Sequence, residues 1–406
     1  MHSIPTLIIG GGVAGAAVAA SLAERRRGAG VTVADVDLFG RYSTTALAAG
    51  DCWTLMDQPL AARLALQSAR YYLEHAAKLD YRPRGAMWLV DAHRFDRPTG
   101  YRASARAAGA HAVDLPVDLL RSRFPMFGDT SDLAGAVFAP GDGRLLPHRL
   151  RLHFLNVAEA GGVQLMDRWQ VVGIAGDRAP FEVTLRQVTG RGVRPALEDE
   201  IAATAKKPAA APPLVVKVDQ LINAAGPWAG RVAALAGVPL QIRPRPRHVF
   251  VLRKDSVNYE PLPGFVDKVG GWSVRYVERD RKPAVLLSTP AEGDARVDFA
   301  APTEQAYRDR WEPVVTRRLP GLAGAAVAAA WTAHDDATPD GLPVIGESRE
   351  RPGLYHCCGL SGRGIALARG SAEAVAIRIV HGRWPVGLDL DEMAAGRFAG
   401  GTGARP

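Results

Sequence analysis

The segment that most constrains the fold is a short apolar run, residues 6–9, which breaks into three glycines and continues as an alanine-rich stretch over residues 16–26. This order predicts a buried strand, a tight turn and a helix. Gly10, Gly12 and Gly15 fill the G-x-G-x-x-G spacing. In that motif one glycine allows the turn, one lets the backbone approach a pyrophosphate, and one lets the helix pack against the strand.

A second strand supports the same interpretation. Residues 31–35 are apolar and end in Asp35, about 20 residues past the last glycine, where a ribose-binding carboxylate usually stands. The N-terminus of the intervening helix offers unpaired N–H groups and a positive dipole end to phosphates. The sequence therefore predicts a Rossmann-type dinucleotide site rather than a purely structural glycine turn.

The composition is that of an ordinary globular enzyme: of 406 residues, 47% are hydrophobic and 23% are charged. No apolar run approaches the roughly 18 residues that span a bilayer. Residues 1–5 lead directly into the first strand, which leaves no room for a signal peptide. Three cysteines, of which Cys357 and Cys358 are adjacent, make no disulfide framework. We therefore expect a cytoplasmic protein without a membrane span.

The chain is basic, with a net charge of +8 and a pI near 9.6. The basic residues are scattered, with short clusters only at residues 25–27 and 243–247, and we find no motif of a nucleic-acid-binding module. We expect a solvated basic surface and no nucleic-acid partner. Attraction of an anionic substrate or redox partner is the alternative.

The C-terminal part repeats the strand–glycine–helix order. Residues 354–358 indicate a strand, residues 359–364 a glycine-rich turn, and residues 366–380 a helix. Between the two glycine turns, residues 239–330 alternate strand patterns with Pro/Gly turns, and residues 187–217 read as an inserted loop. The pattern predicts a discontinuous, two-domain α/β chain.

Four further segments carry a family resemblance: residues 142–150, 218–228, 338–346 and 359–365. With the N-terminal glycines, they make the chain resemble the D-amino-acid oxidase and glycine and sarcosine oxidase superfamily of FAD-dependent oxidoreductases (DAO family). The resemblance implies a Rossmann-like FAD-binding domain of the GR2 type with an inserted β-rich α+β substrate domain. The implied boundaries are 1–90, 140–235 and 335–395 for the FAD-binding domain, 91–139 and 236–334 for the substrate-binding domain, 187–217 for a loop insertion, and 396–406 for a tail.

The resemblance also implies how FAD binds. The turn at residues 359–365 would pass beneath the isoalloxazine, where N–H groups or Arg363 would stabilise negative charge on the reduced ring. Non-covalent attachment is expected, because Ala333 stands where sarcosine oxidases carry the linking cysteine. The expected FAD contacts are Gly10, Gly12, Val13, Ala14, Gly15, Asp35, Thr44, Thr45, Ala49, Gly50, Val171, Ala225, Gly226, Trp228, Gly359, Ser361, Gly362, Arg363, Gly364 and Ile365.

The chain departs from the family where relatives hold a substrate carboxylate. Asp335 stands where glycine oxidases have an arginine, and Ala366 where sarcosine oxidases have a lysine. The hypothesis is that the substrate is not a simple small α-amino acid. It is either an amine steered by Asp335, or an amino acid held by another arginine, Arg247 or Arg275. The opposing interpretation is that Asp335 and its neighbour Asp336 are surface carboxylates in a loop.

The reaction implied by the resemblance is hydride transfer from the carbon next to an amine onto flavin, giving an imine that hydrolyses. Electrons would pass to O2 or to another acceptor, and the sequence favours neither. The alternative is a flavoprotein subunit or maturation enzyme that acts with a protein partner or on a large or peptidyl substrate. No metal site is expected. The candidate catalytic residues are Arg275, Tyr276, His334, Asp335 and Arg363.

Overall fold

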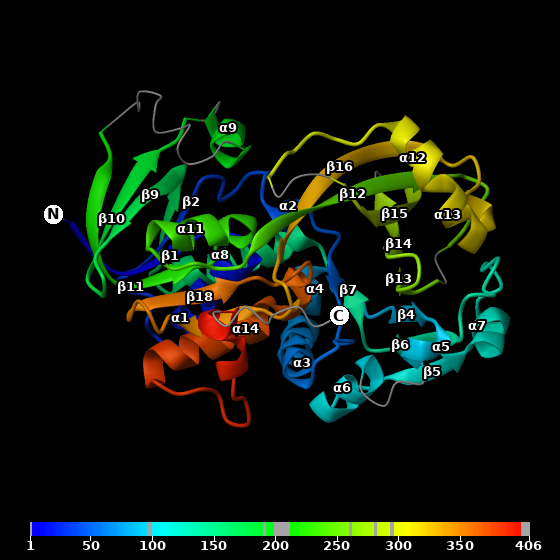
Figure 1. Ribbon diagram of the computed structural model, residues 1–406, viewed down its shortest axis with the longest axis horizontal. Coiled ribbons are helices and arrows are strands. Elements are labelled where there is room, and N and C mark those ends of the chain that lie inside the picture. Colours follow the sequence, from blue (N-terminus) through cyan, green and yellow to red (C-terminus); the bar gives the residue numbers. More distant parts are fainter. Residues whose placement is uncertain are drawn as a thin grey trace.

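Strand β1 (His2–Ile9) lies inside an eight-stranded sheet, on the left of Figure 1. Its apolar half is buried on both faces: Ile8 faces one helical layer, whereas Leu7 and Ile9 face a second hydrophobic cluster. The sheet runs β17-β18-β11-β1-β2-β8, with β10 and β9 added antiparallel beside the first half of β11. These strands are β2 (Val31–Asp35), β8 (Gln164–Asp167), β9 (Trp169–Ala175), β10 (Phe181–Gln187), β11 (Leu214–Asn223), β17 (Val344–Glu347) and β18 (Leu354–Cys358).

This computed structural model describes residues 2–95, 100–189, 192–198, 212–259, 262–279, 282–292 and 296–398. The smaller elements outside the two large sheets are α2 (Thr44–Leu47), β3 (Asp51–Cys52), α4 (Ala76–Leu79), α5 (Ala92–Phe95), α6 (Tyr101–Ala108), β7 (Gly143–Arg144), α9 (Val193–Glu198), η2 (Gly226–Trp228), α11 (Ala229–Leu235), η3 (Pro320–Leu322), η4 (Asp391–Met393) and η5 (Ala395–Phe398). Within the described part of the chain, no helix is long and apolar enough to cross a membrane.

A layer of four helices lies on one side of this first sheet, with α3 packed against α14, and small residues let the helices pack closely. Helix α1 is buried from Val13 to Ala23, because neighbouring helices contact it on two sides. At the crossing of α14 and α3, a Cβ on Gly370 would lie 2.2 Å from the Leu64 carbonyl oxygen, so only glycine fits. The helices are α1 (Val13–Glu24), α3 (Pro59–Glu74), α8 (Pro147–Ala160) and α14 (Gly364–His381).

A second eight-stranded sheet forms the right half of Figure 1, in the order β16-β12-β15-β14-β13-β4-β6-β5. One face packs against α7, α12 and α13 through a core that includes Phe250, Phe265 and Trp311. Because side chains alternate between the faces of a strand, the intervening residues point to the opposite face. The elements are β4 (Ala86–Val90), β5 (Val113–Pro116), α7 (Val117–Arg123), β6 (Gly135–Ala139), β12 (Arg243–Arg253), β13 (Gly264–Asp267), β14 (Trp272–Arg279), β15 (Lys282–Pro290), α12 (Glu304–Arg310), α13 (Glu312–Arg318) and β16 (Ala326–Ala337).

Strand pairing in the second sheet places two of the domain boundaries at other residues than the sequence led us to expect. Strand β4 pairs with β6 and β13, so the boundary expected after residue 90 falls before residue 86 instead. Strand β16 pairs with β12 as far as Ala337, which is beyond the expected boundary at residue 335. The physical reason is the same in both cases: an apolar run predicts a strand, but its pairing partners lie far away in the sequence.

The expected loop insertion, residues 187–217, contains helix α9, and β11 begins within it at Leu214. Residues 190–191 and 199–211 of this segment lie outside the described residues. The expected tail begins later than residue 396, because η5 continues to Phe398; residues 399–406 are likewise outside the described part. The mixed α/β architecture expected from the sequence is confirmed.

Candidate active site

In the N-terminal glycine turn, Gly10, Gly12 and Gly15 have different structural roles. Gly10 has a φ of +101°, and a Cβ there would lie 2.5 Å from the Ala224 carbonyl oxygen. A Cβ on Gly15 would lie 1.9 Å from the Gly10 oxygen, so this glycine lets α1 pack against the turn and does not itself line the cavity. Gly12 borders the cavity, and a Cβ there would meet only the Thr45 hydroxyl, at 3.3 Å. Two glycines therefore shape the turn, and Gly12 opens it towards a ligand.

Polar side chains hold this turn in place. The Gly11 N–H donates to Asp35 Oδ2 at 2.5 Å, and the Asp37 N–H donates to Asp35 Oδ1 at 2.7 Å. The Val13 N–H donates to Thr45 Oγ1 at 2.9 Å. Burial raises the pKa of Asp35 above its usual range, while the two N–H donors act in the opposite direction. Asp35 thus closes the end of β2 against the glycine turn, at the edge of the cavity.

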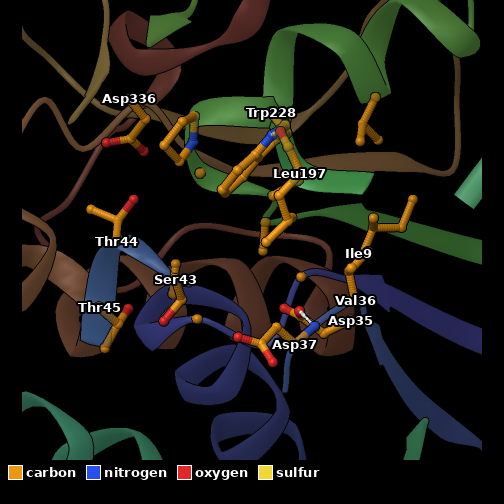
Figure 2. Close-up of a pocket in the computed structure, with 18 of the residues that line it drawn as sticks. Ile9, Asp35, Val36, Asp37, Ser43, Thr44, Thr45, Leu197, Trp228 and Asp336 are labelled. Atoms are coloured by element: carbon orange, nitrogen blue, oxygen red, sulfur yellow. Dashed lines mark hydrogen bonds between the residues drawn. The ribbon is translucent and has the colours of Figure 1, made fainter. Parts of the chain in front are cut away.

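The first cavity extends from this turn along the carboxyl ends of β1, β2 and β11. Its empty space is about 1100 Å³, including the part open to solvent. Figure 2 shows Asp35, Asp37 and Val36 below it, Trp228 and Leu197 above it, and Thr44 and Asp336 at one end. Leu197 belongs to α9, and its carbonyl accepts a hydrogen bond from Trp228 Nε1 at 2.8 Å. Helix α9 belongs to the expected loop insertion, residues 187–217, so part of that insertion lines the first cavity. No motif in the sequence indicated this contact.

A second cavity, about 1660 Å³ including solvent-open space, continues from the first. The two share five lining residues: Val13, Thr44, Thr45, Asp336 and Gly364. Segments from both ends of the chain thus border one elongated site, with α1 and α14 both starting at its middle. A long site that passes a glycine turn and two helix N-termini fits a dinucleotide with its pyrophosphate at that point.

The C-terminal glycine turn, between β18 and α14, is held by Asp336. Its carboxylate accepts hydrogen bonds from the N–H groups of Leu360, at 2.9 Å, and Ser361, at 3.1 Å. Burial raises the pKa of Asp336 to about 6. Ser361 and Gly362 both have positive φ, and a Cβ on Gly362 would lie 2.7 Å from Asp335 Oδ2. The turn therefore passes closely under the carboxylates of β16.

Asp335 and Asp336 are not surface carboxylates in a loop. Both lie on strand β16 and are less than a tenth exposed. Asp335 forms an ion pair with Arg245 on the neighbouring strand, with an N–O distance of 3.1 Å. The register explains this contact, because Arg245 is directly opposite Asp335 in the β12–β16 ladder. The role of Asp336 as an acceptor for the turn needs long-range contact and has no signal in the local sequence.

The five candidate catalytic residues do not all reach the second cavity. Arg275, Asp335 and Arg363 line it, whereas His334 and Tyr276 do not. Tyr276 points to the opposite face of β14, where it packs against the core and borders a separate small cavity. The His334 ring lies against Phe299, and its Nε2 accepts from the Asp298 N–H at 3.2 Å. Successive side chains of a strand point to opposite faces of the sheet. Because Tyr276 and His334 are each next in sequence to a residue that lines the cavity, their own side chains point away from it.

Two of the arginines in the second cavity are engaged by the protein. Arg275 is 4% exposed and pairs with Asp51, with Nη1 2.6 Å from Oδ1. Burial lowers the pKa of Arg275, and the Asp51 charge opposes that shift. Arg363 donates to the Gly341 carbonyl oxygen and lies 3.6 Å from the Met56 sulfur. Arg275 is therefore a buried structural cation.

Arg247 and Lys268 are different. Arg247 Nε donates to Ser288 Oγ at 3.1 Å and Nη2 to the Ser288 carbonyl at 3.4 Å. Lys268 Nζ lies 4.5 Å from the Trp88 ring centroid and 5.1 Å from that of Tyr101. Among the described residues, no carboxylate is within ion-pair distance of either cation. Burial lowers the pKa of both. The sequence offers Arg247 as an alternative anchor, but it gives no local sign that would distinguish Lys268.

The remaining wall of the second cavity carries aromatic and acidic side chains but no thiol among the described residues. Trp53 and Trp88 line it and meet edge to face, with ring centroids 6.1 Å apart. Cys52, Cys357 and Cys358 are buried and free, and burial raises the pKa of each thiol. In the part of the chain that the structure describes, neither cavity is lined by a cysteine or histidine that could link a flavin. This lining fits a non-covalently bound cofactor.

Comparison with known proteins agrees with this geometry. The family model described as "FAD dependent oxidoreductase" (DAO) matches residues 6–378. FAD-dependent oxidoreductase domain-containing protein 1 of Xenopus laevis is 24% identical, over 97% of this chain and 82% of that protein. Human mitochondrial sarcosine dehydrogenase is 23% identical over 93% of this chain, which spans 40% of that longer protein.

A solved structure gives the same fold. The crystal structure of L-proline dehydrogenase from P. horikoshii superposes with a TM-score of 0.80 at 19% identity, covering all of both chains. At that identity the likeness concerns the fold alone. The family match, in contrast, spans almost the whole chain and includes both glycine turns. The elongated site has a lining that fits FAD, and the chain belongs to the DAO family of FAD-dependent oxidoreductases.

Proposed function

We propose that this protein oxidises a C–N bond of an amino acid, with the substrate carboxylate bound by Arg247. The observation that carries the proposal is a half-buried guanidinium in the second cavity with no carboxylate partner among the described residues. A planar guanidinium matches a carboxylate bidentately and keeps its charge at any physiological pH. The names of two similar proteins, sarcosine dehydrogenase and L-proline dehydrogenase, denote C–N oxidation of substrates that carry a carboxylate.

FAD, when bound, supplies the acceptor for the hydride that leaves the carbon next to the amine. The protein has to orient that C–H bond and exclude water. Arg247 would fix one end of the substrate, and its contacts with Ser288 hold the guanidinium on the β12–β15 surface. Trp53 and Trp88 provide an apolar wall. The substrate amine must be unprotonated to release the hydride, and the imine product then hydrolyses.

The alternative in which Asp335 steers a substrate amine has less support. Asp335 already has a counter-charge in Arg245, and it lies against the backbone of Gly362. A carboxylate that is paired in this way attracts a cationic amine weakly, because the ion pair would have to break first. Arg247 has no ion-pair partner in the described part of the chain, although the charge of Asp335 acts on it. The cavity charges therefore favour binding of an anion over binding of a simple amine.

The test is anaerobic bleaching of the bound flavin by a substrate panel. Each amino acid is paired with the amine that lacks its carboxylate, for example sarcosine with dimethylamine and proline with pyrrolidine. We expect bleaching only by the amino acid of a pair. The variant Arg247→Met should raise the dissociation constant of that amino acid about 10- to 100-fold, as loss of a charge-assisted hydrogen bond implies.

The matched control is Arg243→Met, on the same strand but exposed and outside both cavities. It should leave substrate affinity and flavin content unchanged. Bleaching by the amines as fast as by the amino acids would overturn carboxylate binding. No bleaching by any small molecule would instead support the alternative of a protein partner or a large substrate.

A further inference from the structure

The concave face of the second sheet presents a continuous row of side chains to the cavity. Arg247 pairs with Ala333 and Pro290, and the adjacent row of ladder partners runs from Val249 through Ser288 and Ser273 to Val266 and Trp88. Lys268 follows Val266 by two residues and lines the same cavity. Three strand spacings separate β12 from β13, which places the backbones of Arg247 and Lys268 about 14 Å apart. Ser288 and Ser273, two residues further along the strands, form a serine floor beside the line that joins the two cations.

The cavity charges do not cancel once the contacts of each group are considered. Arg275 pairs with Asp51, and Arg245 pairs with Asp335. Asp267 is engaged by Arg318 from outside the cavity, with an N–O distance of 3.1 Å, and Asp336 caps the C-terminal turn. Arg247 and Lys268 remain among the described lining residues without an ion-pair partner, although the charge of Asp335 acts on Arg247 and that of Asp57 on Lys268.

Lys268 is held in place without an anion. Its backbone N–H donates to the Leu89 carbonyl, which fixes the residue at the end of β13. Its ammonium lies over Trp88 and Tyr101, and no described residue accepts a hydrogen bond from it. An ammonium has three donors and loses much of its hydration on burial. Burial lowers the pKa of Lys268, the charge of Asp57 opposes that shift, and the charges of Arg363, Arg94 and Arg247 add to it. A ligand anion at this position would satisfy the donors and relieve the repulsion.

We propose that the substrate carries two anionic groups, one bound by Arg247 and the other by Lys268, with the reacting amine between them over the serine floor. The class is that of amino or secondary-amino dicarboxylic acids. This inference rests on the proposed function, because it names the substrate class of the same site. It also explains why the cavity needs no anion-binding arginine at position 335. A single carboxylate would leave one of the two cations uncompensated.

The first experiment measures binding without turnover. The holoenzyme is titrated with unreactive dicarboxylates (malonate, succinate, glutarate) and with monocarboxylates of the same length (acetate, propionate, butyrate), and the flavin absorbance reports binding. We expect one dicarboxylate to bind at least about tenfold more tightly than its partner, the factor expected for one additional charge-assisted contact. Equal affinities throughout the series would overturn the inference.

Variants assign the two anion sites. Lys268→Met should abolish the preference for the dicarboxylate and leave monocarboxylate affinity within about twofold, whereas Arg247→Met should weaken both ligands. Lys282→Met, an exposed lysine at the start of β15, is the control and should retain the full preference. A dicarboxylate preference that persists in Lys268→Met would contradict the assignment of Lys268.

The second experiment separates this inference from the proposed function. Anaerobic bleaching is compared for iminodiacetate against sarcosine, and for both enantiomers of aspartate and glutamate against those of alanine. Faster bleaching by the dicarboxylic members supports both proposals. Equal bleaching by the two sets overturns the dianion inference and leaves C–N oxidation standing. If no compound bleaches the flavin while the Lys268-dependent dicarboxylate preference persists, C–N oxidation fails and the dianion site remains.

Discussion

The two cavities of the FAD-dependent site are built on different principles. The first is enclosed by strand ends, glycines and backbone N–H groups of the parallel sheet. The second is lined by side chains from the face of a sheet and from the segments around it, and ten of its described lining residues are charged: Asp51, Asp57, Arg245, Arg247, Asp267, Lys268, Arg275, Asp335, Asp336 and Arg363. The backbone cradle, meaning the N-terminal glycine turn and the strand ends beside it, tolerates few substitutions, because an added Cβ would collide with backbone atoms. A sheet face can exchange side chains freely, which lets relatives with one fold act on different substrates.

The first prediction breaks the backbone cradle. Gly15→Ala places a Cβ 1.9 Å from the Gly10 carbonyl oxygen, so α1 has to move away from the turn. We expect a loss of about 3 kcal/mol or more in the free energy of unfolding, or no folded protein. Gly12→Ala is the contrast: its Cβ meets only the Thr45 hydroxyl at 3.3 Å, so the fold should persist with weaker FAD binding. Thermal unfolding and flavin content of the two variants make the comparison, and equal stability would argue against distinct roles.

The second prediction separates structural from binding cations in the second cavity. Arg275→Met leaves Asp51 buried without its partner and should cost about 3–5 kcal/mol, as breaking a buried pair does. The double variant Asp51→Asn with Arg275→Met should recover part of that loss. Arg247→Met loses two hydrogen bonds to Ser288 but breaks no ion pair, so it should cost less than Arg275→Met, about 1–2 kcal/mol. Urea unfolding measures all three, and a large loss in Arg247→Met would show that this cation is structural too.

The third prediction concerns Asp336, which lines both cavities. Burial raises its pKa from 3.8 to about 6 in the folded chain. An acid of raised pKa binds its proton more tightly when folded, so its stabilisation is present below pH 4 and is lost as the pH rises through 6. Relative to Asp336→Asn, the native protein should lose up to about 3 kcal/mol between pH 4 and 7. Parallel pH profiles of unfolding for the two proteins would contradict this.

The smallest expected effect is at the outer wall of the first cavity. Trp228→Phe removes the hydrogen bond from Nε1 to the Leu197 carbonyl oxygen and should weaken FAD binding by about 1 kcal/mol, roughly a factor of five. Trp384→Phe also removes an indole hydrogen bond, to Asp391, but lies outside both cavities and serves as the control. Quenching of flavin fluorescence measures the affinities. An unchanged affinity in Trp228→Phe would show that α9 does not contribute to holding the cofactor.

Much of the FAD-binding part of the fold could be predicted, because the sequence patterns that indicate it are local. The glycine spacing, the apolar strand before it and the carboxylate at Asp35 each reflect a steric or electrostatic requirement within a few residues. The α/β fold, the family and FAD were inferred in this way and are confirmed. The set of individual FAD contacts stays a prediction, although most of those residues line the two cavities. Gly15 and Gly359 do not line them and act in packing instead.

By itself, the sequence determined the two glycine turns and the strand and helix around each, because backbone sterics at these positions admit few alternatives. Only the tertiary structure decided which charges face the substrate cavity. Adjacent residues on a strand point to opposite faces, so Arg275 lines the cavity while Tyr276 enters the core. Pairing between strands far apart in the chain then determines which charges form ion pairs and which, like Arg247 and Lys268, have no such partner among the described residues.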